Sequence, residues 1–149
     1  MRIELAVDRH RERLVALRHV AGWDADLVDA WLADVAAGRR VLWIAERDGI
    51  DVGMIALVLV NDDPEIADGR RCACVTSLVV VAAERRRGLG RVLTEHVENA
   101  ARDRGFGTLT LYTGVDNWGA LGLYRGLGYV SWKETVRDWG TAIHLRKPL

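Results

Sequence analysis

The segment from Leu78 to Arg91 restricts the possible folds more than any other part of the chain. The apolar run Leu78-Val79-Val80-Val81 is typical of a strand, and it leads through Arg85-Arg86-Arg87-Gly88-Leu89-Gly90 into a helical pattern. The first amides of a helix have no partner within it, and with the helix dipole they favour a bound phosphate. Glycine lets the backbone approach that group closely, and arginine can hold its oxygens. The segment therefore predicts a phosphate-binding turn between a strand and a helix.

Apolar runs predict seven strands along the chain. The pair Asp48-Gly49 lies between two of these runs and is a strong hairpin signal. The expected strands are Ile3–Val7, Val41–Glu46, Val52–Val60, Cys72–Val81, Thr108–Tyr112, Tyr129–Val136 and Thr141–Leu145.

Helical spacing predicts four helices, each with cap signals. Asp8 is expected to cap the first, which Gly22 ends, and Asp24 or Asp26 the second, which Gly38 ends. Asn117 is expected to cap the fourth, which stops at Gly128. The expected apolar face of the third helix consists of Leu89, Val92, Leu93, His96, Val97 and Ala100.

The element order is therefore β-α-α-β-β-β-α-β-α-β-β. Hairpins followed by strand–helix–strand crossovers predict an α/β chain, more closely an α+β fold, with a mixed sheet and helices packed on it. We find no repeat, low-complexity tract or linker, so residues 1–149 are expected to form one domain. The polar stretch Asn61–Arg71 is expected to be a loop, either functional or plain surface.

Charge and composition exclude several kinds of partner. Lys plus Arg and Asp plus Glu both number 21, so no overall field attracts nucleic acid or anionic lipid. The start lacks the apolar core of a signal peptide, and no stretch is apolar enough to span a membrane. We therefore expect a soluble, cytoplasmic protein with no nucleic-acid or membrane partner. Cys72 and Cys74 are expected to be small buried hydrophobes, and no metal site is expected.

Other readings of the arginine-rich turn are weaker. A P-loop needs the pattern Gly-x-x-x-x-Gly-Lys-Ser/Thr, which does not occur in this sequence. A dinucleotide fingerprint needs a third Gly or Ala, but Leu93 stands there. A nucleic-acid patch would have arginines beyond a single turn and more aromatic neighbours. A purely structural arginine-rich turn is the remaining alternative.

Two blocks of the sequence resemble the GNAT superfamily of N-acetyltransferases. Arg85-Arg86-Arg87-Gly88-Leu89-Gly90 is similar to its (Gln/Arg)-x-x-Gly-x-(Gly/Ala) motif. The segment from Asn117 to Tyr129 is similar to its Asn-x-x-Ala-x-x-Leu-Tyr-x-x-x-Gly-Phe/Tyr pattern. The order of elements fits as well, so the resemblance covers nearly the whole chain. It implies a central pair of splayed strands and acetyl-CoA as co-substrate.

The same resemblance implies which residues bind the cofactor. Amides of the turn would hold the pyrophosphate, and the main chain at Leu78 and Val80 would pair with the pantetheine arm. Ala82 and Arg86 depart from the Pro and Gly found in many members, yet neither change removes a donor. The implied cofactor-binding residues are Leu78, Val79, Val80, Arg85, Arg86, Arg87, Gly88, Leu89, Gly90, Arg91, Asn117, Ala120 and Tyr124.

The resemblance also suggests catalytic residues. Tyr124 is the candidate general acid for the leaving thiolate, although a locally bonded core aromatic is the alternative. Many members carry a base where this chain has Thr76, which cannot accept a proton at neutral pH. Asp62, Asp63 and Glu65 are possible bases, as is a water chain. Trp23 or Trp31 could line an acceptor pocket, whereas His96 is expected in the core.

The expected function is acetyl transfer from acetyl-CoA to a primary amine of a small molecule or peptide. A non-catalytic acyl-CoA-binding module is the alternative, and a nucleotide-binding or protein-interaction domain is a weaker one. A homodimer is possible by analogy with the family, through a hairpin that carries Trp132 and Trp139. The acceptor amine stays open.

Overall fold

The computed structural model describes residues 1–22 and 27–149, and its elements follow the predicted order. The expected cap at Asp24 or Asp26 and the expected pocket residue Trp23 lie outside the described residues. Two short 3-10 turns, η1 (Asp8–His10) and η3 (Ala82–Glu84), accompany the main elements. These are β1 (Arg2–Leu5), α1 (Arg11–Val20), α2 (Val28–Ala36), β2 (Arg40–Arg47), β3 (Ile50–Val58), β4 (Cys72–Val80), α3 (Leu89–Asp103), β5 (Thr108–Gly114), α4 (Trp118–Gly126), β6 (Val130–Arg137) and β7 (Gly140–Pro148).

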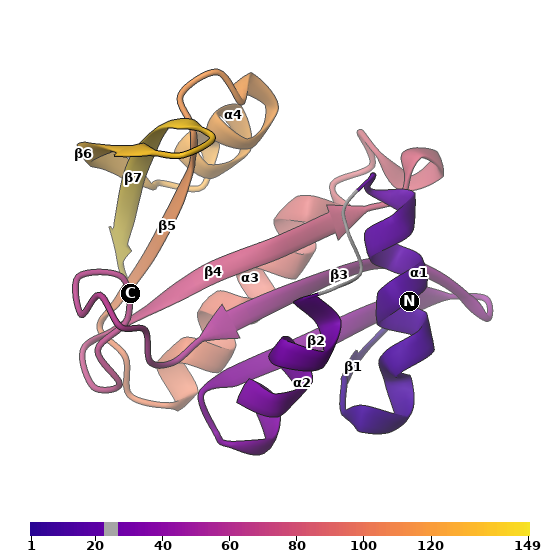
Figure 1. The fold of residues 1–149 in the computed structure, drawn as a ribbon. Helices are drawn as coiled ribbons and strands as arrows, with labels where there is room; N and C mark the ends of the chain where they lie inside the picture. The colour runs from indigo at the N-terminus through magenta and orange to yellow at the C-terminus, as the bar shows by residue number, and fades with distance from the viewer. Residues whose placement is uncertain (23–26) are drawn as a thin grey trace.

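The strands form one mixed sheet in the order β1-β2-β3-β4-β5-β7-β6, which confirms the predicted fold class (Figure 1). All neighbours are antiparallel except β4 and β5. Leu14, Leu17 and Trp31 from α1 and α2 pack on one face of the sheet. Leu93 and Val97 of α3, with Tyr124 of α4, belong to the core on the other face. The sheet therefore separates two helical layers.

The parallel pair β4 and β5 stays together only at its beginning. The two strands pair from Cys72–Thr108 to Cys74–Thr110 and then diverge (Figure 1). Backbone groups beyond that point on the facing edges are free of ladder bonds between these strands. The splayed central pair implied by the sequence is thus confirmed, and it opens the middle of the sheet.

A β-bulge lies on β4 at the start of this opening. Met54 of β3 pairs with Val79, and Ala56 pairs with Thr76. Between these pairs β3 has one residue and β4 has two, Ser77 and Leu78, so β4 carries the extra residue of the bulge. Ser77 takes up the extra length with a φ of 58°, in the left-handed region that side chains rarely adopt. The bulge bends the strand and redirects Ser77 and Leu78 at the splay.

Three predictions about the helices are wrong. Asp8 does not cap α1, because residues 8–10 form a 3-10 turn in which the buried His10 accepts the Val7 N–H at Nδ1 (2.9 Å). Val92 is exposed, and His96 lies only half-buried with its ring edge-on to Trp43. The buried face of α3 is instead turned toward Thr94 and Glu98. Its members are Leu89, Leu93, Thr94, Val97, Glu98 and Ala101.

A buried ion pair connects α3 to the second half of the sheet, and we expect its loss to be costly. Glu98 is buried, and its Oε2 accepts hydrogen bonds from Lys147 Nζ and from the Tyr129 hydroxyl, both at 2.9 Å. Lys147→Met leaves that carboxylate without its cation and should lower the free energy of unfolding by about 1–3 kcal/mol. Urea denaturation measures this change. Arg91→Met breaks only the exposed pair with Glu95 and should cost less than about 0.5 kcal/mol; equal losses would contradict the prediction.

Candidate functional site

The arginine-rich turn has the backbone of an anion-binding site. Arg86 has a φ of 64° and Gly88 a φ of 81°, so the chain is left-handed at two nearly adjacent residues. Gly88 is also the N-cap of α3, and no side chain caps that end. Its first amides therefore remain available to a ligand, in the concave arrangement that binds phosphate. The left-handed φ at Arg86 also accounts for the glycine that many similar sequences carry there.

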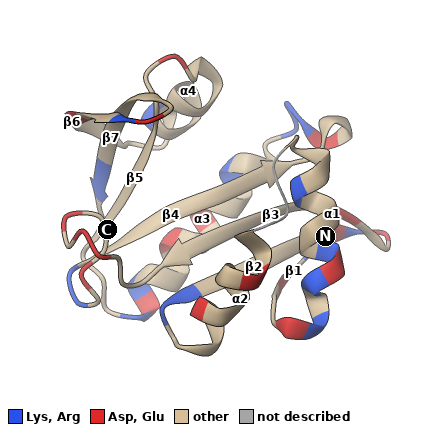
Figure 2. Cartoon of the chain, viewed as in Figure 1, with Lys and Arg blue, Asp and Glu red and all other residues tan. Residues whose placement is uncertain are grey.

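The predicted phosphate-binding residues share one cavity of about 480 Å³. It lies beyond the end of β4, where Figure 2 shows blue arginine positions gathered in one loop. Gly90 lets α3 approach α4, since a Cβ there would lie 3.2 Å from Leu123 Cδ2. Arg87 does not line the cavity. The lining residues are Leu78, Val80, Glu84, Arg85, Arg86, Gly88, Leu89, Gly90, Arg91, Gly119 and Leu123.

A second cavity of about 290 Å³ continues along the edge of β4. Leu78, Val79 and Val80 line it on one side, and α4 lines it on the other with Gly119, Ala120 and Leu123. The Arg85 side chain lies along this edge, where Nε donates to the Val80 carbonyl (3.3 Å). The cavity has the extended, largely apolar form that suits a flexible chain.

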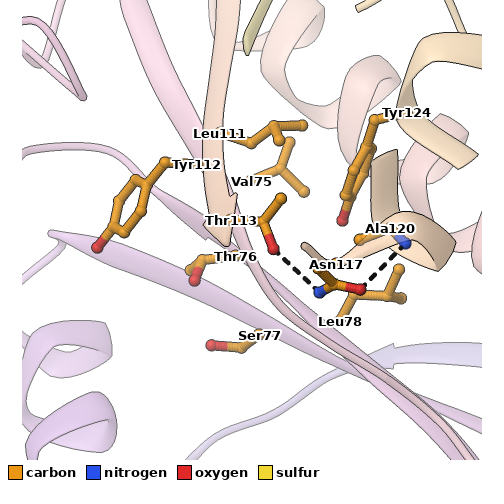
Figure 3. Close-up of a pocket in the computed structure, with 10 residues that line it drawn as sticks. All are labelled: Val75, Thr76, Ser77, Leu78, Leu111, Tyr112, Thr113, Asn117, Ala120 and Tyr124. Carbon is orange, nitrogen blue, oxygen red and sulfur yellow. Dashed lines mark hydrogen bonds between the residues drawn. The ribbon is translucent and has the colours of Figure 1, made fainter. Parts of the chain in front are cut away.

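A third cavity of about 250 Å³ occupies the splay between β4 and β5. Asn117 holds α4 against it, because Oδ1 accepts the Ala120 N–H (3.4 Å) and Nδ2 donates to Thr113 Oγ1 (3.0 Å) (Figure 3). The predicted helix cap at Asn117 is thereby confirmed. The lining residues are Val75, Thr76, Ser77, Leu78, Leu111, Tyr112, Thr113, Asn117, Ala120 and Tyr124.

Tyr124 places a buried phenol in the third cavity. Its ring packs edge-on against Tyr129, and its hydroxyl points toward Ala120 and Asn117 (Figure 3). Within the described residues, nothing hydrogen-bonds that hydroxyl. Burial raises the pKa of Tyr124 well above its ordinary value. The phenol therefore keeps its proton at neutral pH and can donate it to a group in the cavity.

Among the described residues, those that line the third cavity contribute hydroxyls but no carboxylate or imidazole. Thr76 contributes one of the hydroxyls. The three acidic residues considered as bases lie elsewhere: Glu65 pairs with Lys133 (3.1 Å), Asp63 accepts the Glu65 N–H (2.9 Å), and Asp62 is fully exposed. None of the three lines the splay.

A fourth cavity of about 290 Å³ adjoins the third and shares Thr76 and Ser77 with it. The remaining lining residues are Arg18, Leu27, Trp31 and Arg40. Trp31 thus lines a cavity, and its role in an acceptor pocket stays a prediction. Arg40 was not singled out, although strand alternation places it on the same face as Leu42 and Ile44, an unusual position for an arginine. Ser77 was missed because a left-handed bulge has no signature in residue type.

Comparisons with known proteins agree on one family. The model of the acetyltransferase (GNAT) family matches residues 6–129. N-acetyltransferase 8 of Rattus norvegicus is 32% identical over 114 residues, which cover 76% of this chain and 49% of that protein. N-acetyltransferase 8B of Mus musculus is 34% identical over 122 residues, covering 78% and 51%. The chain thus spans about half the length of the curated relatives it matches.

Solved structures show the same fold. Ribosomal-protein-alanine N-acetyltransferase from Brucella melitensis superimposes with a TM-score of 0.82 at 19% identity, covering 100% of both chains. A GNAT family acetyltransferase from Elizabethkingia anophelis, solved with acetyl-CoA bound, has a TM-score of 0.79 at 16% identity, covering 99% of this chain and 97% of that one. At these identities the likeness concerns the fold alone. Among the described residues, no helix is long and apolar enough to cross a membrane.

Proposed function

This chain belongs to the GNAT acetyltransferase family, and from that premise we propose that it transfers an acetyl group from acetyl-CoA to a primary amine of a small molecule or peptide. One observation carries the proposal. Leu78 lines the phosphate cavity, the cavity along β4 and the cavity in the splay. The three form one path of the kind that a long, phosphate-bearing thioester needs. It ends beside the proton-bearing hydroxyl of Tyr124.

The residues along this path fit acetyl-CoA. The left-handed turn at Arg86 and Gly88, with the uncapped start of α3, suits the pyrophosphate. The β4 edge from Leu78 to Val80 would pair with the amides of the pantetheine arm in the manner of an added strand. Asn117 and Ala120 would face the end of the arm from α4. The other residues proposed to bind acetyl-CoA are Val79, Arg85, Leu89, Gly90 and Arg91.

We derive the chemistry from the residues around the splay. Bound acetyl-CoA supplies an activated carbonyl carbon, which the neutral amine attacks directly. The new C–N bond replaces the C–S bond, and Tyr124 donates the proton of its hydroxyl to the departing sulfur. The amine loses a proton, and because no described residue of the cavity carries a carboxylate, we assign that proton to water at its mouth, through which a proton returns to the Tyr124 oxygen. The hydroxyls of Thr76 and Ser77 can orient such water.

The missing base in the splay favours one other function, a non-catalytic acyl-CoA-binding module. Two measurements separate the functions. Calorimetry should show acetyl-CoA binding to the wild-type protein, and a CoA-release assay against a panel of primary amines should show turnover. Binding without turnover on any amine would favour the module. No binding at all would overturn both proposals.

A further inference from the structure

Arg40 is a largely buried cation, and two of its side-chain nitrogen atoms make no hydrogen bond within the described residues. Its side chain is only 14% exposed, and neither Nε nor Nη1 has a hydrogen-bond partner among the described residues. Asp34 Oδ2 lies 3.8 Å from Nε, too far for a hydrogen bond. Burial lowers the pKa of Arg40, but a guanidinium stays charged in proteins. Asp34 therefore offsets part of the charge, but the two buried N–H groups without a hydrogen bond destabilise the fold, so their presence calls for a reason beyond packing.

The surroundings of Arg40 suit an anion. Its guanidinium lies over the Trp31 ring, 5.6 Å from the centroid, and Arg18 lies over the same ring at 4.6 Å. Of the described residues that line this fourth cavity, none is acidic. Thr76 and Ser77 add two neutral hydroxyls. The cavity thus combines positive charge, a planar aromatic face and neutral donors.

The position of this cavity links it to acetyl transfer. Thr76 and Ser77 line both it and the splay, so the two spaces adjoin at the bulge of β4. Arg40 lies on the sheet face covered by α1 and α2, whereas Tyr124 belongs to the core on the opposite face. A molecule held at Arg40 would therefore reach the splay from the side opposite Tyr124. That is the side from which an incoming amine can attack while Tyr124 protonates the sulfur.

We propose that Arg40 binds an anionic group of the acceptor, so that the substrate is a primary amine that also carries a carboxylate or a phosphate. The inference rests on the proposed function and narrows its substrate class. A guanidinium fork matches either group in bidentate geometry. Polycationic amines are correspondingly disfavoured, because they would bring a second positive charge against Arg40.

Anion binding can be measured without turnover. The melting temperature is followed in saturating CoA with N-acetylleucine, with the neutral N-acetylleucinamide or with inorganic phosphate, at constant ionic strength. N-acetylleucine or phosphate should stabilise the wild-type protein, and N-acetylleucinamide should not. Arg40→Met should abolish the anion-dependent shift. The inference is overturned if neither anion stabilises the wild type, or if Arg40→Met responds as the wild type does. The more effective anion distinguishes carboxylate from phosphate.

Kinetics then test the substrate class. For leucine and phosphoethanolamine, Arg40→Met should raise KM by about tenfold to a hundredfold, as expected for a lost charge-assisted hydrogen bond. KM for leucinamide should change little. The inference, but not the transfer activity, would be overturned if wild type and Arg40→Met both prefer leucinamide or putrescine to leucine and phosphoethanolamine. An anion-dependent shift in melting temperature without turnover on any amine would support anion binding at Arg40 and contradict the transfer activity.

Two further variants control for folding. Arg39→Met removes the same charge one residue away, at an exposed side chain 3.9 Å from Asp62 that lines neither cavity, and it should behave as the wild type. Without ligand, Arg40→Met should melt near the wild-type temperature, since removing a largely buried charge with unmet hydrogen bonds offsets the lost packing, and Asp34 stays accessible to solvent. If that variant does not fold, Arg40→Gln removes the charge with less loss of polarity and takes its place.

Discussion

Tyr124→Phe is expected to lower kcat for acetyl transfer by about two to four orders of magnitude, the range typical of a lost general acid. The phenol is buried beside the splay and keeps its proton because burial raises its pKa. Phenylalanine fills the same space but leaves the departing sulfur without a donor. Affinity for acetyl-CoA should change less than about threefold, since the turn and the β4 edge are untouched. A CoA-release assay gives kcat, and calorimetry gives the affinity.

Tyr129→Phe is the matched control for this experiment. Tyr129 belongs to the same edge-on aromatic pair, but its hydroxyl donates to Glu98, away from the splay. Its replacement should cost stability through the lost hydrogen bond and leave kcat near the wild-type value at temperatures well below unfolding. Equal kcat for Tyr124→Phe and wild type would remove Tyr124 from the acid role. An equal loss in both variants would indicate a packing effect.

Gly88→Trp is expected to weaken acetyl-CoA binding by about a hundredfold or more, equivalent to losing one or two charge-assisted hydrogen bonds. Gly88 has a φ of 81° and is the N-cap of α3, next to the amides proposed to bind the pyrophosphate. An indole there is strained at that φ and projects into the site that the phosphates would occupy. Calorimetry with acetyl-CoA measures the loss directly.

Gly105→Trp separates occlusion of the site from backbone strain. Gly105 has a φ of 86°, has open space around it and follows the opposite end of α3. The Gly105→Trp variant therefore has a similar backbone strain far from the turn, and it should bind acetyl-CoA as the wild type does. Normal binding by Gly88→Trp would show that the turn does not hold the cofactor, and weak binding by both would point to instability.

Much of the fold followed from sequence because its signals are local. Gly22 and Gly38 are left-handed beyond the ends of α1 and α2, and Asn117 caps α4, as their residue types suggested. The face of α3 was harder, because Val92 and His96 lie at helical spacing with the true core residues. Only the docking of the helix on the sheet decides which edge of such a stripe is buried.

The site residues also fall into those that a local motif encodes and those that only the tertiary fold brings together. The turn and Leu78 to Val80 share a connected path as expected, because one continuous motif encodes them. Tyr112 meets the site only through the tertiary fold and had no local signal, whereas the signal at Arg40 was limited to its place on the apolar face of its strand. Asp62, Asp63 and Glu65 were considered for their chemistry, and the course of their loop places them outside the splay cavity.

The short seam between β4 and β5 has a consequence for how such a protein can change. Three pairs of residues, from Cys72–Thr108 to Cys74–Thr110, join the strands on either side of the opening. Beyond this seam the proposed cofactor path is lined by β4, α3 and α4, whereas the fourth cavity adds residues of α1, α2 and the start of β2 to the two β4 residues that it shares. If the fourth cavity receives the acceptor as proposed, substitutions in α1, α2 or the start of β2 can alter the choice of amine while β4, α3 and α4 continue to bind the thioester. Diversification of acceptors is then a matter of changing one layer of the molecule at a time.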